Sequence, residues 1–129
     1  MNFAYNVDCV KMRYFNYTEF DSPDEVGSGQ KMHPDILEML DQARDKFDKP
    51  IRINSGYRTA KHNLKVGGRP NSSHLRGLAV DIACGSSVDR YHLLNCLLDV
   101  GFKRIGISKY FIHVDIDDEK DDEVIWTYA

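Results

Sequence analysis

A carboxylate inside an apolar run is the first residue whose type and position suggest chemistry. Asp81 lies in LAVDIA (78–83), where every other residue is apolar. An unpaired carboxylate in a buried strand would cost several kcal/mol, so Asp81 needs a cation or a set of hydrogen-bond donors. A buried arginine or backbone N–H groups would meet that need, and so would a metal ion. Taken alone, Asp81 favours the arginine or the backbone.

A histidine in an alternating run is the second candidate. In FIHVDID (111–117), the apolar residues Ile112, Val114 and Ile116 would share one face of a strand. The opposite face would carry Phe111, His113, Asp115 and Asp117. A face of this kind suits a solvated sheet edge and a metal-lined cleft equally well.

His74 is the third candidate, at the end of a polar loop and seven residues before Asp81. A lone loop histidine is usually an ordinary surface residue. Two imidazoles and one carboxylate, with a fourth position left for water, form the ligand set of catalytic zinc. Such an ion lowers the pKa of bound water to about 7 and polarises a substrate carbonyl. Together the three residues predict one zinc ion on His74, Asp81 and His113.

The elements that must position these residues follow from local patterns. An amphipathic helix is predicted over HPDILEMLDQARDKF (33–47), with His33 at its start, and a half-buried strand over IRINS (51–55). A long loop is expected over 60–73. After the strand 78–83, Ser86 or Ser87 should cap a helix that Gly101 ends. The buried stripe of that helix would be Leu93, Leu94, Leu97 and Leu98, with His92 on its surface. Further strands are expected at FKRIGIS (102–108), YFIHVDID (110–117) and VIWTY (124–128).

This order predicts a single α+β domain over residues 1–129, with a mainly antiparallel sheet and helices packed on one side. Residues 1–30 are weakly patterned, and we interpret them as an N-terminal arm that wraps a core of residues 31–129. A chain of 129 residues is long enough for one hydrophobic core. We expect it to be a monomer.

Charge and cysteine content exclude several classes of protein. The net charge is −3 and no basic block occurs, so no nucleic-acid partner is expected. No apolar run approaches the length of a membrane span, so no membrane insertion is expected either. The N-terminus lacks the pattern of a signal peptide, which predicts synthesis in the cytoplasm. Three cysteines without CxxC spacing, Cys9, Cys84 and Cys96, favour buried thiols over one disulfide plus a free thiol.

The segment SSHLRGLAVD (72–81) fits the pattern SxHxxGxAxD at every defined position. It resembles the M15 zinc peptidases, the D-alanyl-D-alanine carboxypeptidase and dipeptidase family that includes phage peptidoglycan endopeptidases. SGYRTAKHN (55–63) resembles the family's SGYR segment, and IHVD (112–115) resembles its second histidine strand. The resemblance covers about residues 30–116. It implies a fold like that of the hedgehog domain and the D-Ala-D-Ala peptidases, with zinc on His74, Asp81 and His113.

The resemblance also implies roles for residues around the metal. Arg58 would bind the terminal carboxylate or a backbone carbonyl of the substrate, and Ser72 would bind substrate or orient its loop. Many members carry an acidic general base three residues before the last zinc histidine, but this chain has Tyr110 there. Asp115 is the substitute that we predict, because it shares a strand face with His113. The alternative is that Asp115 only holds a zinc histidine or a nearby arginine. His62 is the other candidate, as a proton donor or an oxyanion stabiliser.

The function implied is metal-assisted hydrolysis of amide bonds in the stem or cross-link peptides of peptidoglycan, by carboxypeptidase or endopeptidase action. Asp115 or another acid would take the proton of the attacking water, and the metal, with Arg58 or His62, would stabilise the oxyanion. Two other hypotheses remain. In the first, the chain is a zinc-bearing but inactive peptidoglycan-binding module, which the resemblance to the hedgehog domain and the tyrosine at position 110 suggest. In the second, it is a metal-free protein in which Asp81 pairs with Arg58. Without a signal peptide, a wall hydrolase would reach its substrate after release or delivery, as in phage or prophage lysis.

Overall fold

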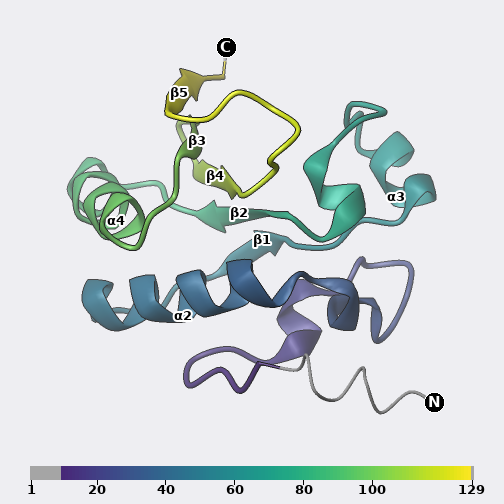
Figure 1. Ribbon diagram of the computed structural model, residues 1–129, viewed down its shortest axis with the longest axis horizontal. Coiled ribbons are helices and arrows are strands. Elements are labelled where there is room, and N and C mark those ends of the chain that lie inside the picture. The colour runs from purple at the N-terminus through teal and green to yellow at the C-terminus, as the bar shows by residue number, and fades with distance from the viewer. Residues whose placement is uncertain (1–9, 129) are drawn as a thin grey trace.

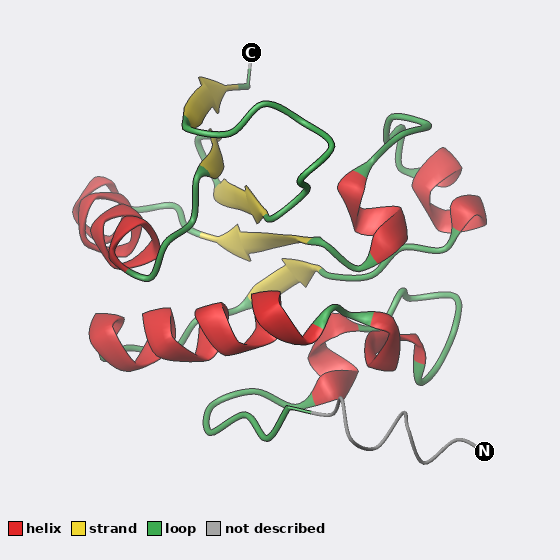
Figure 2. Cartoon of the chain, in the orientation of Figure 1, coloured by secondary structure: helices red, strands yellow, loops and turns green. Residues whose placement is uncertain are grey.

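The computed structural model describes residues 10–128, and Figure 1 shows how its elements are arranged. The helices are η1 (Tyr17–Phe20), η2 (Ser28–Lys31), α2 (Pro34–Phe47), α3 (Ala60–Lys65), η3 (Ser73–Arg76) and α4 (Ser87–Asp99). The strands are β1 (Ile53–Ser55), β2 (Ala79–Ala83), β3 (Arg104–Ile107), β4 (Phe111–Asp115) and β5 (Val124–Thr127). They form one sheet in the order β1-β2-β4-β3-β5, in which only the β3–β5 pair is parallel. The predicted α+β class with a mainly antiparallel sheet is confirmed (Figure 2).

Both long helices begin where their capping residues predict. His33 is the N-cap of α2, and its side chain accepts a hydrogen bond from the Asp35 N–H. Pro34 is the first residue of the helix. The Ser86 side chain accepts from the Asp89 N–H, which starts α4. The buried stripe of α4 is narrower than predicted. Leu93 and Leu97 are buried, Leu94 is half-buried, and Leu98 is 45% exposed because it lies beyond the face that packs on α2.

The sheet separates an apolar core from a polar face. Side chains that alternate along β2, β3 and β4 pack with α2 and α4, and all are fully buried: Val80, Ile82, Ile105, Ile112 and Val114. Because successive side chains of a strand point to opposite faces, the residues between them lie on the other face. That face receives Asp81, His113 and Asp115 together.

The segment 60–73 is not the continuous loop that the sequence predicted. It begins with α3, because the Thr59 hydroxyl accepts a hydrogen bond from the His62 N–H and caps a short helix. The two glycines and the proline that indicated a loop follow this helix, in residues 66–72. The Ser72 side chain then caps η3, the short helix that carries His74.

The described part of the N-terminal arm, residues 10–30, packs against the core. Phe15 and Phe20 are buried in it, and the Phe20 carbonyl accepts a hydrogen bond from the Tyr57 N–H at 2.9 Å. The thiols of Cys84 and Cys96 are free, the first buried and the second half-exposed. Cys9 lies outside the described residues. Among residues 10–128, no helix has the length and apolarity needed to cross a membrane.

Candidate metal centre

The strand register places the two strand-borne candidates side by side. Asp81 of β2 pairs with His113 of β4, and His113 in turn pairs with Gly106 of β3. Gly106 pairs with Trp126 of β5. One lateral row therefore runs Asp81–His113–Gly106–Trp126 across four strands. Because residues in one row of a sheet share a face, the side chains of this row all belong to the polar face.

The third candidate, His74, is brought to this row by η3. The Ser72 hydroxyl accepts a hydrogen bond from the His74 N–H at 3.2 Å. Gly77 ends the turn with a φ of 69°, where a side chain would collide with the carbonyl of Lys31. The His74 ring is buried, and its Nδ1–H donates to the Gly56 carbonyl at 2.8 Å. This bond occupies Nδ1 and leaves Nε2 as the nitrogen that faces Asp81 and can bind a ligand.

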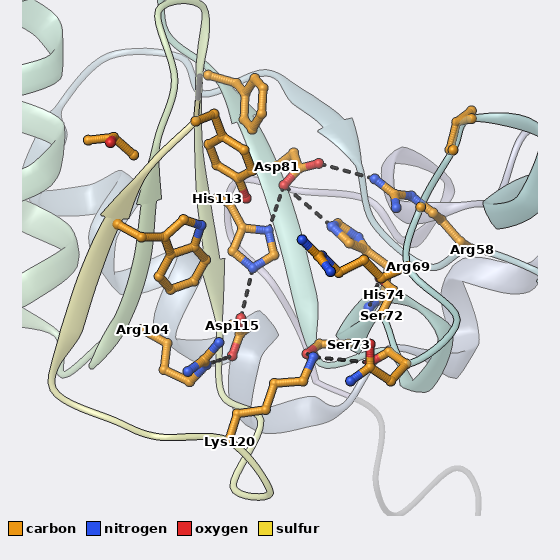
Figure 3. A pocket seen from close by; sticks show the side chains of 18 residues that line it. Arg58, Arg69, Ser72, Ser73, His74, Asp81, Arg104, His113, Asp115 and Lys120 are labelled. Carbon is orange, nitrogen blue, oxygen red and sulfur yellow. Dashed lines mark hydrogen bonds and ion pairs between the residues drawn. The ribbon is translucent and has the colours of Figure 1, made fainter.

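The three side chains form one compact group (Figure 3). Asp81 Oδ1 lies 2.8 Å from His113 Nδ1 and 3.4 Å from His74 Nε2. The ligand atoms of the three residues all lie within 4.8 Å of one another. Tetrahedral zinc with bonds of about 2.0–2.2 Å separates its ligand atoms by about 3.3 Å. The two nitrogens, the oxygen and their spacing therefore fit a zinc ion.

The electrostatics of the group also call for a cation. Burial raises the pKa of Asp81, but hydrogen bonds from His113 and His74 outweigh burial and hold that pKa well below its ordinary value. Burial lowers the pKa of His113, but hydrogen bonds to Asp115 and Asp81 outweigh it, and the pKa is raised. Asp81 thus keeps its negative charge and draws positive charge to the point where the three residues meet.

Behind His113 lies a chain of charged partners. His113 Nε2 is 2.8 Å from Asp115 Oδ2, and Asp115 Oδ1 accepts a hydrogen bond from Arg104 Nε at 2.7 Å. The Asp117 N–H donates to the same Oδ1 at 3.1 Å. A histidine whose second nitrogen is held by a carboxylate is oriented as a metal ligand. The structure thus places the predicted base, Asp115, on the side of the imidazole away from Asp81.

Arg58 is tied to the same group from the opposite side. Its guanidinium donates to Ser55 Oγ at 3.1 Å, to Asn63 Oδ1 at 3.1 Å and to Asp81 Oδ2 at 3.3 Å. The Arg58 side chain is 15% exposed. Asp81 therefore contacts Arg58 and both histidines at the same time. Its Oδ2 accepts from Arg58, and its Oδ1 faces the two histidines.

The metal group lies in a cleft of about 740 Å³, a size typical of small-molecule sites. Four cations line it. Arg58 is paired with Asp81, Arg104 with Asp115, and Lys120 bonds to Ser73 and the Asn71 carbonyl. The fourth, Arg69, is exposed and makes no side-chain hydrogen bond or ion pair with any residue in 10–128. Figure 3 shows Arg69 and Arg104 on opposite sides of the metal group.

Several predicted residues lie elsewhere. His62 is half-buried on α3 near Asp24 and does not line the cleft. Tyr110 is 67% exposed in the turn before β4, also outside the cleft. Asp117 is buried after the end of β4, where Ser73 donates to it at 2.6 Å and Arg76 pairs with it. Ser72 does line the cleft, where it caps η3.

Sequence reasoning missed several residues that line the cleft, among them Arg69, Arg104, Lys120, Trp126 and Tyr128. The alternation of β5 does place Trp126 and Tyr128 on one face. That pattern carries no information about which strand β5 pairs with, so it could not connect them to His113. Arg69 carries no local signal beyond its place in a polar loop.

Comparison with known proteins agrees with this geometry. A family model described as Peptidase M15 matches residues 11–117, most of the chain. A 39-residue segment is 49% identical to the zinc D-Ala-D-Ala carboxypeptidase of Streptomyces albus G. That segment is 30% of this chain and spans 15% of the length of the Streptomyces protein.

Proposed function

The chain belongs to the Peptidase M15 family of zinc metallopeptidases, and from this premise we propose that it hydrolyses amide bonds in the stem or cross-link peptides of peptidoglycan. The observation that carries the proposal is the metal group itself. Three buried or nearly buried side chains, His74, Asp81 and His113, converge within 4.8 Å in a cleft large enough for a short peptide.

His74 Nε2, one oxygen of Asp81 and His113 Nδ1 would hold the ion. Zinc bound there supplies a Lewis acid that polarises the scissile carbonyl and makes water a nucleophile near neutral pH. The protein's part is to fix its ligands before substrate arrives. The Gly56 carbonyl orients His74, Arg58 orients Asp81, and Asp115 orients His113.

For Asp115 we propose the orienting role over that of general base. Both of its oxygens are engaged, one by His113 and the other by Arg104 and the Asp117 N–H. Burial raises the pKa of Asp115, but the hydrogen bond from His113 and the other donors outweigh burial and lower it. A carboxylate with a lowered pKa is a weak base, and this one faces away from Asp81.

Two observations support the proposed substrate class, one from the cleft and one from the relative. Arg69 presents an unpaired guanidinium that can form a bidentate contact with a peptide carboxylate. Stem peptides of peptidoglycan carry such carboxylates, and the relative from Streptomyces albus G is named for D-Ala-D-Ala. Peptides that end in D-Ala-D-Ala are therefore the first substrates to test.

We further propose a role in phage or prophage lysis. Clearing of permeabilised bacterial cells by the added chain would test it.

One observation favours a second candidate function, an inactive zinc-bearing module that binds peptidoglycan. Among residues 10–128, the carboxylates that line the cleft are Asp81 and Asp115, and both are tied to other residues. No free carboxylate is therefore available among them as a general base.

Digestion of purified peptidoglycan separates the two functions. The zinc-loaded chain, the chain with a chelator, and the His113→Ala variant are each incubated with peptidoglycan, and released peptides are mapped by mass spectrometry. We expect a single type of amide bond to be cut by the zinc-loaded chain alone. Co-sedimentation with peptidoglycan without any released peptide would instead establish the binding module.

A further inference from the structure

The strand β5 lies beyond the family match, which ends at residue 117, yet it forms one wall of the cleft. It runs parallel to β3 at the edge of the sheet (Figure 1). Trp126 lies on β5 and Tyr128 follows directly after its end, two residues further along, and both side chains line the cleft.

Gly106 is the reason that these side chains reach the metal strand. Gly106 lies between His113 and Trp126 in the lateral row. A Cβ at Gly106 would lie 2.7 Å from both Trp126 Nε1 and Tyr128 Cε2. The two aromatic side chains therefore occupy the space over β3 that any other residue would fill. Across this gap, the Trp126 ring comes to 5.5 Å from the ring of His113, centroid to centroid.

Tyr128 crosses the same gap. Its ring lies 5.2 Å from the ring of Phe111, on the strand of His113, and 6.4 Å from that of Trp126. The Trp126 ring packs edge-on against the Tyr128 ring, with an interplanar angle of 63°. A tyrosine hydroxyl can donate as well as accept a hydrogen bond, so Tyr128 can offer its O–H to a group bound in the cleft.

The surroundings of Tyr128 keep that hydroxyl protonated. A tyrosine hydroxyl ordinarily has a pKa of about 10, and burial raises the pKa of Tyr128 further. The hydroxyl is thus a neutral donor in the wall of the cleft that contains the metal group, at any pH near neutrality.

We propose that Tyr128, held in place by Trp126 over Gly106, is a catalytic residue that donates a hydrogen bond to the substrate's carbonyl oxygen as it becomes an oxyanion. This inference rests on the proposed peptidase function. In the reaction, water oxygen bonds to the carbonyl carbon, the C–N bond breaks, and the leaving amine takes up a proton from the water. Tyr128 keeps its own proton throughout and acts only by stabilising negative charge.

Tyr128→Phe tests the proposal, because it removes the hydroxyl and keeps the ring against Phe111 and Trp126. Loss of one oxyanion donor lowers kcat by about 10²–10³-fold. We therefore expect a fall of about 100-fold in kcat with KM within about twofold. Tyr110→Phe is the matched control, since Tyr110 is exposed outside the cleft, and it should behave as wild type.

A binding measurement makes the inference independent of turnover. The probe is a D-Ala-D-Ala peptide whose scissile amide is replaced by a tetrahedral phosphinate, and its affinity for the zinc-loaded chain is measured by calorimetry. Tyr128→Phe should weaken phosphinate binding at least 10-fold and leave the binding of the amide's product peptide unchanged. Equal phosphinate affinity in wild type and Tyr128→Phe would overturn the inference, even with full peptidase activity. A wild-type chain that binds phosphinate through Tyr128 but releases no peptide would instead contradict the proposed function.

Discussion

His113 Nε2 lies 2.8 Å from Oδ2 of Asp115, on the opposite side of the imidazole from the nitrogen that faces Asp81. Both residues are on β4, two positions apart, and both are buried. The pair therefore turns the ring so that Nδ1 meets the other candidate ligands. Arg104 continues the chain behind Asp115 and fixes the carboxylate in turn.

Asp115→Asn should weaken zinc binding, because an amide orients the imidazole less well than a carboxylate. Loss of such a partner typically costs 10–100-fold in metal affinity or activity. We expect a loss of about 10-fold or more in zinc affinity, measured by competition with a chromogenic chelator. Asp118→Asn, at an exposed neighbouring position, is the control. Unchanged zinc affinity together with abolished turnover would show instead that Asp115 is the general base.

Gly106→Ala should push the side chains of Trp126 and Tyr128 away from β3. The new methyl group would lie 2.7 Å from Trp126 Nε1, so the indole must move. Overpacking of this kind costs about 1–3 kcal/mol in the free energy of unfolding. Trp126 is the chain's one tryptophan, so its fluorescence reports the displacement directly. Gly85→Ala, where an added Cβ meets nothing within 4 Å, should change neither stability nor emission. An unshifted emission spectrum in Gly106→Ala would refute the close packing.

Gly77→Ala should disturb the turn that presents His74. Gly77 and Gly67 both have a positive φ, 69° and 74°, so alanine costs about 1–2 kcal/mol at either position. Only at Gly77 would the Cβ also collide with a backbone atom, the carbonyl oxygen of Lys31. Denaturant titration should therefore show a larger loss of stability in Gly77→Ala than in Gly67→Ala. Equal losses would mean that the chain around Lys31 moves freely out of the way.

The buried carboxylate of Asp117 should make stability fall in acid. Burial raises the pKa of Asp117, but hydrogen bonds from Ser73 and Arg76 outweigh burial and lower the pKa to about 2. A folded-state pKa below the unfolded value of about 3.8 gives stability that is present above pH 4 and lost as the pH falls toward 2. Asp117→Asn should lose about 2 kcal/mol at pH 7.

Denaturant titrations at several pH values would check this prediction. Between pH 4 and 2, Asp117→Asn should show a shallower fall in stability than the wild type. The control variant Asp118→Asn, altered at the exposed neighbour, should follow the wild-type curve. A variant curve parallel to that of the wild type would exclude Asp117 as the source of the acid sensitivity.

Much of the fold follows from local patterns. The alternation of FIHVDID separates Ile112 and Val114 from His113 in the structure as it does in the sequence. Asp81 could be identified because burying a carboxylate in an apolar strand costs free energy, and the apolar residues around it are visible in the local sequence. The caps at His33 and Ser86 are likewise local, since a capping side chain bonds within its own first turn.

The remaining features depend on long-range pairing, which local patterns do not encode. β5 pairs with β3 in parallel. Trp126 approaches His113 across Gly106 of β3, because Gly106 has no side chain between the two rings. The partner of Asp115, Arg104, is contributed by β3, and its sequence neighbours give no sign of this. His62 was predicted as a proton donor or oxyanion stabiliser, but α3 places it outside the cleft.

Native mass spectrometry of the zinc-loaded chain tests the central claim most directly, because it counts metal ions per folded chain. The variants are His74→Ala, Asp81→Asn and His113→Ala, with His92→Ala on the exposed face of α4 as control. The structure predicts one zinc ion in the wild type and in His92→Ala, and none retained by the other three at the same zinc concentration. Stoichiometric zinc in any of those three, or its absence from the wild type, would contradict the assignment.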